Sequence, residues 1–175
     1  PRDGRGRFED TGEHRRVAYV DIDVHHGDGI YYAFEDDPDL IFAVIHEDGR
    51  YLYPGTGDAA ETGTGRARGT KLNIPLSPGA DDDEFVAAWA RVLGHLRHHR
   101  PEFVIFQCGV DSLRGDPLGH LKFTPFSHTH ATTTLCALAD EFCDGRLMAF
   151  GGGGYSLDNC ASGWCAVLDT LVAAG

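Results

Sequence analysis

The sequence predicts an α/β fold of three layers, in which helices cover both faces of a mostly parallel sheet. Short apolar, β-prone runs alternate with longer amphipathic stretches, a pattern typical of parallel strands joined by crossover helices. Polar or glycine-rich segments follow three of these apolar runs, and open α/β sheets carry their sites at such strand ends. With 175 residues, the chain is long enough for a single domain with a sizeable core.

Each expected strand is a short run rich in valine, isoleucine, leucine or phenylalanine. The expected strands are 16–21, 40–46, 70–75, 102–107 and 146–150. The expected helices are about 29–35, 82–100, 125–142 and 157–173. The helix from 82 is supported by four acidic residues at 81–84, where the helix dipole favours negative charge. Residues 1–15 are rich in glycine and charge, so we expect a disordered tail there and a folded unit over 16–175.

Composition narrows the classes of function. The formal net charge is −12, which argues against a protein that wraps nucleic acid and is compatible with cationic substrates. No apolar run approaches the length of a membrane span, and no basic-then-apolar leader is visible. We therefore expect a cytoplasmic protein with no direct nucleic-acid or membrane partner.

The run Asp-Ile-Asp-Val-His-His-Gly-Asp-Gly at 21–29 follows the first expected strand. Side chains alternate along a strand, so Asp21, Asp23 and His25 are expected to share one face. Two carboxylates and an imidazole are costly to keep together without a partner or a metal. The alternative is a polar strand end with three solvated groups.

A fourth polar residue, Asp111, lies just past the expected strand 102–107. Together with Asp23 and His25 it gives three protein ligands from two neighbouring strand ends. A catalytic zinc site keeps three protein ligands and leaves one position open. Because two of the ligands are carboxylates, Fe²⁺ or Co²⁺ could compete with Zn²⁺.

A third loop carries four glycines at 151–154, followed by Tyr155. Glycines let a backbone approach a ligand closely, and no Lys-Ser/Thr pair follows them to indicate a phosphate-binding loop. A neutral phenol can donate a hydrogen bond to a developing oxyanion. The alternative for Tyr155 is an aromatic ring that packs on the sheet edge.

The run His-Glu-Asp-Gly-Arg-Tyr-Leu-Tyr-Pro-Gly at 46–55 resembles most closely the bacterial acetoin-utilisation deacetylase branch of the zinc-dependent histone deacetylase superfamily, and four motifs in this order resemble the superfamily as a whole. They are the run at 21–29, Tyr-Pro-Gly-Thr-Gly at 53–57, Gln-Cys-Gly-Val-Asp at 107–111 and Gly-Gly-Gly-Gly-Tyr at 151–155. The resemblance extends from about Arg16 to the C-terminus and implies an arginase/deacetylase-like fold, with 16–175 as the C-terminal part of the catalytic domain. It also implies a hydrolase that removes acyl groups from amines such as acetyl-lysine by metal-activated water.

The resemblance assigns roles to individual positions. Asp23, His25 and Asp111 would bind the zinc, and Tyr155 would polarise the amide carbonyl and hold the oxyanion. Asp21 and Asp28 would orient a tandem histidine pair that handles the proton of water. The substrate channel would be lined by Tyr53, Leu118 and Gly153.

A monovalent cation such as K⁺ is a further implied cofactor. Asp21 and Asp23 would help to hold it. The position that usually offers a hydroxyl is Val44 here, so the cation would depend more on backbone carbonyls.

The chain also departs from the family pattern. The tandem histidines belong upstream of the 21–29 motif, where this chain has only His14. An alternative is therefore a non-catalytic or partner-requiring fragment that keeps the metal site but lacks the His-His proton shuttle. A third reading, a binuclear manganese ureohydrolase, would need a second carboxylate two residues after Asp111, where Leu113 stands. The substrate stays open among acetylated lysine, a polyamine and another acyl-amine.

Overall fold

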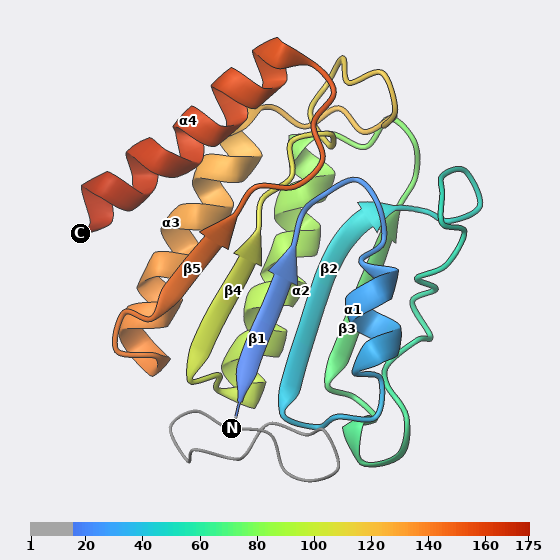
Figure 1. Ribbon diagram of the computed structural model, residues 1–175, viewed down its shortest axis with the longest axis vertical. Coiled ribbons are helices and arrows are strands. Elements are labelled where there is room, and N and C mark those ends of the chain that lie inside the picture. The colour runs from blue at the N-terminus through green and yellow to red at the C-terminus, as the bar shows by residue number, and fades with distance from the viewer. Residues whose placement is uncertain (1–15) are drawn as a thin grey trace, which may run out of the picture.

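The computed structural model describes residues 16–175 and contains one five-stranded sheet in the order β3-β2-β1-β4-β5 (Figure 1). Its neighbouring strands all pair in parallel, so the predicted fold class is confirmed. The strands are β1 Val17–Asp21, β2 Leu40–Glu47, β3 Lys71–Leu76, β4 Phe103–Gln107 and β5 Leu147–Phe150. Each begins and ends within one residue of its expected bounds. The predicted tail at 1–15 lies outside the described residues.

The central position of β1 explains where a site can form. β1 pairs with β2 on one side and with β4 on the other, and Asp21 lies opposite Gln107 in the β1–β4 register. Because the strands are parallel, the segments that follow β1 and β4 leave the sheet side by side at the same edge.

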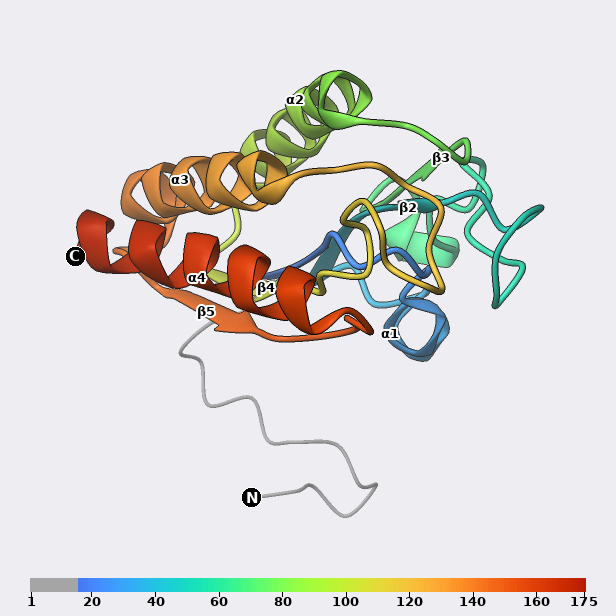
Figure 2. The ribbon, with the colours of Figure 1, turned by 90° about the horizontal axis from the view of Figure 1, so that it is seen from above.

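Within residues 16–175, four α-helices connect or follow the strands, as the sequence predicted. They are α1 Asp28–Ala33, α2 Asp82–His99, α3 Pro125–Phe142 and α4 Leu157–Ala174, with a 3₁₀ turn, η1, at Gly65–Ala67. α2 begins at a capping box formed by Asp81 and Glu84, and α3 begins with Thr124 as N-cap and Pro125 in the first turn. α2 and α3 lie over one face of the sheet with α4 beside α3, and α1 lies on the opposite side (Figure 2).

The main core lies between the sheet and α2, α3 and α4. Alternate residues of the central strands, among them Val20 and Phe106, are fully buried there. The indole of Trp89 is buried in the same cluster and donates a 2.7 Å hydrogen bond to Thr134 Oγ1, which links α2 to α3. Burial of each large apolar side chain stabilises the fold by about 1.5–3 kcal/mol, so this face holds the strand ends firmly in place.

The opposite face of the sheet is covered unevenly. Tyr31 of α1 packs with Phe42 and Val44 of β2 in a small second cluster. At the β5 edge, Met148 and Phe150 alternate with core-facing residues and are each 48% exposed. An open apolar strand at a sheet edge is a surface that favours association.

No helix within 16–175 combines the length and apolarity that a bilayer crossing requires.

Candidate metal centre

Asp23 and His25 lie in the loop that follows β1. The expectation that strand alternation would align Asp21, Asp23 and His25 was wrong in its mechanism, because β1 ends at Asp21. A chain of local hydrogen bonds orients these residues instead. The backbone N–H of Asp23 donates to Asp21 Oδ1 at 2.9 Å, and that of His25 donates to Asp23 Oδ1 at 3.0 Å. These short polar turns aim both side chains at one point beyond the strand end.

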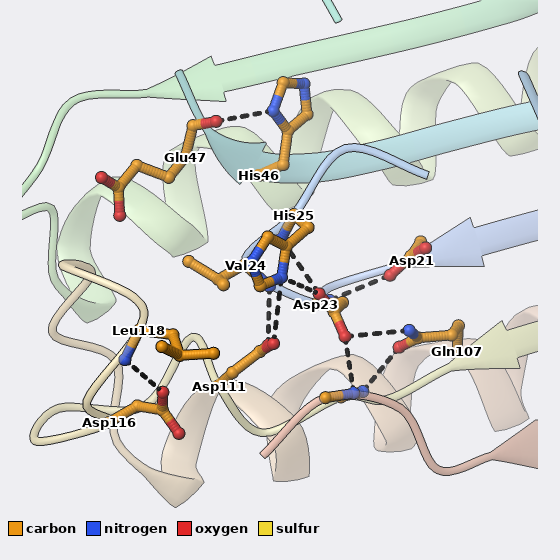
Figure 3. A network of polar contacts seen from close by, with 12 residues as sticks. Asp21, Asp23, Val24, His25, His46, Glu47, Gln107, Asp111, Asp116 and Leu118 are labelled. Carbon is orange, nitrogen blue, oxygen red and sulfur yellow. Dashed lines mark hydrogen bonds and ion pairs between the residues drawn. The ribbon is translucent and has the colours of Figure 1, made fainter. Parts of the chain in front are cut away.

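Asp111 reaches the same point from the segment after β4 (Figure 3). Its Oδ1 accepts a 2.9 Å hydrogen bond from the backbone N–H of Val24, between the two ligand candidates. Its Oδ2 lies 3.2 Å from His25 Nδ1, and Asp23 Oδ1 lies 3.0 Å from the same nitrogen. One ligand atom from each of Asp23, His25 and Asp111 lies within 4.8 Å of the others, as the sequence predicted for a metal site.

Gln107 and the glycine loop hold Asp23 from the other side. Asp23 Oδ2 accepts hydrogen bonds from the backbone N–H of Gly153 at 2.7 Å and from Gln107 Nε2 at 3.0 Å. Gln107 Oε1 in turn accepts from the backbone N–H of Gly109 at 2.6 Å. Sequence reasoning placed Gln107 in a motif but gave it no role. The available signal was an amide side chain at the last position of an otherwise apolar strand.

The ionisation of the cluster reflects crowding of negative charge. The neighbouring carboxylates of Asp111 and Asp23 raise the pKa of His25 to about 10. Burial opposes ionisation of Asp23, but hydrogen bonds, first from His25, hold its pKa down at about 2. Burial raises the pKa of Asp111, and burial together with the charge of Asp23 raises that of Asp21 well above its usual range. An added cation would relieve this excess of negative charge.

The residues present fit a divalent metal ion. Within residues 16–175, the buried Oδ2 of Asp111 accepts no hydrogen bond, although buried carboxylate oxygens are normally satisfied. A Cβ at Gly153 would overlap this oxygen, and a Cβ at Gly109 would overlap Asp23 Oδ2, so glycine is needed where the backbone closes around the cluster. Two carboxylates and one imidazole suit Zn²⁺ and also Fe²⁺ or Co²⁺.

The two aspartates predicted to orient a proton shuttle are placed differently. Asp21 belongs to the network, because its Oδ2 accepts a 2.9 Å hydrogen bond from the hydroxyl of Tyr19 and its Oδ1 binds Asp23 N–H. Asp28 is the first residue of α1, and its carboxylate accepts from the N–H of Gly29 at 2.8 Å. Val44, at the expected cation site, is fully buried.

Tyr155 and Leu118 are joined by a residue that sequence reasoning missed. Asp116 Oδ2 accepts a 2.8 Å hydrogen bond from the backbone N–H of Tyr155, and its Oδ1 accepts a 2.9 Å bond from the N–H of Leu118. Asp116 is only 7% exposed, whereas Leu118 and Tyr155 are 46% and 55% exposed. Tyr53 is more exposed still, at 78%. The structure thus ties Tyr155 and Leu118 to one carboxylate and leaves Tyr53 on the surface.

The chain matches the family model described as "Histone deacetylase domain" over residues 6–171. It is 41% identical over 143 residues to the acetoin utilization protein AcuC of Bacillus subtilis, which covers 81% of this chain and 37% of that protein. It is 38% identical over 152 residues to histone deacetylase clr6 of Schizosaccharomyces pombe, covering 86% of this chain and 36% of that protein. The chain therefore spans little more than a third of these relatives.

Two solved structures also superpose closely on this chain. The histone deacetylase Clr3 superposes with a TM-score of 0.85 at 34% identity, covering 93% of this chain and 27% of that one. The HDA15 HD domain superposes with a TM-score of 0.86 at 33% identity, covering 93% of this chain and 45% of that one.

A binuclear site would need a second carboxylate at position 113. The residue there is Leu113, which is buried in the apolar core.

Proposed function

Since the chain belongs to the histone deacetylase domain family, we propose that it carries the metal centre of a zinc-dependent deacetylase acting on acyl-amines. The observation that supports this best is the convergence of Asp23, His25 and Asp111, together with the buried Oδ2 of Asp111, which has no hydrogen-bond partner among the described residues. A catalytic zinc site with three protein ligands keeps one coordination position for water or a substrate carbonyl.

In this proposal, Asp23, His25 and Asp111 hold the ion. Bound there, Zn²⁺ supplies Lewis acidity toward an amide carbonyl and lowers the pKa of a water molecule. Gln107 and the N–H of Gly153 fix the orientation of Asp23, as groups behind metal ligands commonly do.

The remaining roles concern the substrate and a second cation. Tyr155 donates its phenolic hydrogen bond to the carbonyl oxygen as negative charge develops on it. Leu118, Tyr53 and Gly153 form the wall of the channel. Asp21 contributes to the binding of a monovalent cation such as K⁺, with Asp23 and backbone carbonyls.

The substrate is an amine that carries an acetyl or similar acyl group, such as acetyl-lysine, an acetylated polyamine or a small acyl-amine. The net charge of −12 favours substrates with positive charge near the acyl group. We place the protein in the cytoplasm.

The metal content of purified protein tests the proposal. Wild type is expected to bind about one divalent ion per chain, and the Asp23→Ala, Asp111→Ala double variant none. The matched control is Asp140→Ala, Glu141→Ala, which removes two exposed carboxylates of α3 far from the cluster. Equal metal content in wild type and the Asp23/Asp111 variant would contradict the proposed site.

A second candidate function is a unit that keeps the metal but needs further residues for turnover. It is favoured by the state of the two histidines near the ligand loop. His26 Nδ1 is hydrogen bonded to Thr56 Oγ1 at 2.8 Å, and His46 Nδ1 donates to the carbonyl oxygen of Glu47 at 2.8 Å. Both rings are buried, so neither is presented to solvent as a general base.

A fluorogenic acetyl-lysine assay separates the two candidates. Chain 1–175 alone is expected to show little turnover even with metal bound, because general acid–base catalysis contributes roughly 10²–10⁴-fold. A longer protein that carries a histidine pair upstream of Asp21 is the comparison. Similar turnover in both would show that a residue inside this chain, such as His26 or His120, acts as the base.

A further inference from the structure

The geometry points to Glu47 and His120 as a pair of positioning residues that hold the segment carrying Leu118 against the backbone of the metal ligands. This inference rests on the proposed function, because Leu118 matters as a channel wall only if a substrate approaches the metal centre. It adds two residues from distant parts of the chain that are neither ligands nor part of the proposed channel.

Glu47 is a carboxylate buried at the end of β2. Its side chain is 0% exposed, and both oxygens bind the same residue. Oε2 accepts from the backbone N–H of His120 at 2.7 Å, and Oε1 lies 2.8 Å from His120 Nδ1. A carboxylate that forms two hydrogen bonds with one residue fixes both the position and the orientation of that residue. In Figure 3 the Glu47 side chain extends from β2 toward the side of the site where Leu118 lies.

The backbone of Glu47 is also linked to the ligand loop. Its N–H donates to the carbonyl oxygen of Val24 at 2.9 Å, between Asp23 and His25. His120 is held a third time, because its carbonyl oxygen accepts from the N–H of Gly79 at 2.8 Å. The pair therefore joins the ligand loop after β1, the end of β2 and the connection between β3 and α2.

The segment that carries Leu118 and His120 packs closely against the loops of the proposed metal ligands. Gly119 lies so close to the cluster that a Cβ there would overlap the carbonyl oxygen of Asp111 and lie 2.9 Å from Val24 Cγ2. At the other end of the segment, Asp116 binds the N–H groups of Leu118 and Tyr155.

Leu118 thus stands between two buried carboxylates, Asp116 before it and Glu47 beyond it. Its side chain is 46% exposed, so apolar packing alone does not hold it in place. Fixing a backbone residue costs conformational entropy, and hydrogen bonds to charged groups are strong enough to offset that cost. The two anchors explain how a half-exposed leucine can form a fixed wall.

Hydrogen exchange of chain 1–175 tests the anchor without any need for activity. His120→Ala removes the ring contact, and amides of the 112–123 segment should then exchange about tenfold faster, as expected for loss of one charge-assisted hydrogen bond. His120→Asn should restore slow exchange, because its amide can donate to Glu47 from nearly the same position as Nδ1. The control is His98→Ala, an exposed histidine in the last turn of α2. Unchanged exchange in the 112–123 segment of His120→Ala would overturn the inference.

Two hydroxamate probes test the wall in zinc-loaded protein. Acetohydroxamic acid reaches only the metal, whereas a long-chain hydroxamate with an aryl cap must also pass Leu118. His120→Ala should weaken the long probe about tenfold and leave the short one unchanged, and His120→Asn should rescue the long probe. Equal weakening of both probes would show that the pair supports the ligands and not the wall, and would overturn the inference. If wild type binds neither probe, the proposed function fails, and the exchange measurement alone decides whether the anchor exists.

Discussion

Asp111 and Glu47 are buried carboxylates at the same edge of the sheet, and each lies beside the Nδ1 of a histidine. They differ in how their oxygens are satisfied. Both oxygens of Glu47 bind His120 at 2.7 and 2.8 Å. In the described part of the chain, Oδ2 of Asp111 accepts no hydrogen bond, although it lies 3.2 Å from His25 Nδ1, and a second carboxylate, Asp23, approaches the same nitrogen.

This difference separates the proposed metal ligand from the proposed structural anchor. A buried carboxylate saturated by N–H donors is complete without further partners. Two carboxylates around one imidazole, with one oxygen that has no hydrogen bond among the described residues, carry excess negative charge that a cation can neutralise. The immediate contacts differ in the same way, because glycines close around the Asp111 cluster, whereas His120 occupies both oxygens of Glu47.

The largest expected effect comes from Asp111→Asn. The amide keeps an oxygen for the N–H of Val24 but removes the charge from the ligand set. Zinc affinity should fall by more than about 100-fold, beyond what loss of a group that only orients a ligand costs. Stability of the metal-free protein should stay level, because one buried charge has been removed. Isothermal titration with Zn²⁺ and urea unfolding measure the two quantities. Retained affinity would remove the distinction between Asp111 and Glu47.

The next effect concerns His46, the residue before Glu47, which is fully buried and whose Nδ1 donates to a backbone carbonyl oxygen. Burial lowers its pKa to about 4, whereas the carboxylates around His25 raise the pKa of that residue to about 10. Between the ordinary value near 6.5 and about 4, the unfolded chain binds a proton that folded His46 does not. The unfolding free energy should therefore fall as pH falls through this window, by up to about 3 kcal/mol.

Urea unfolding across that pH range measures the loss. His95 of α2 contributes in the same direction, since burial also lowers its pKa to about 4. His46→Asn keeps an N–H for the carbonyl oxygen of Glu47 and should flatten part of the slope, and His95→Asn should flatten another part. A slope that neither variant changes would mean that other groups govern the acid sensitivity.

These particular residues show what the sequence could predict. The strands and the convergence of Asp23, His25 and Asp111 were predictable, because each candidate ligand follows a recognisable apolar run and parallel strands end at one edge. The alternation argument failed beyond Asp21, since the strand ends there and loop hydrogen bonds take over. A periodic pattern carries no information about a loop whose shape is set by side chain–backbone hydrogen bonds.

The anchors lay beyond sequence reasoning for a different reason. Glu47 and His120 are 73 residues apart, and Asp116 and Tyr155 are 39 apart. Neither pair has a spacing that marks it, and a glutamate at a strand end is most often solvated. Only the packed fold reveals that Glu47 is buried and that its partner is a loop histidine.

A smaller effect is expected for Glu47→Gln. The glutamine amide would set an N–H₂ group against one of the two N–H donors of His120, so one charge-assisted hydrogen bond is lost and a donor faces a donor. The unfolding free energy should fall by about 2 kcal/mol, while zinc affinity stays within a few-fold of wild type. Urea unfolding and zinc titration of the same samples measure both. If Glu47→Gln lost zinc binding, Glu47 would act on the proposed ligands. Glu47 and Asp111 would then differ only in how strongly they affect zinc affinity.

The smallest effect is expected one residue further along, at Asp48. This carboxylate also has a basic partner, because Arg50 Nη2 lies 2.6 Å from its Oδ2, and hydrogen bonds from Arg50 lower its pKa. The Arg50 side chain is 74% exposed, so water screens the pair and competes for both groups. Arg50→Ala should therefore leave both the melting temperature and zinc affinity unchanged within error, as followed by thermal unfolding and zinc titration. A clear drop in melting temperature would show that contact with a basic group, and not burial, decides which carboxylates at this edge stabilise the fold.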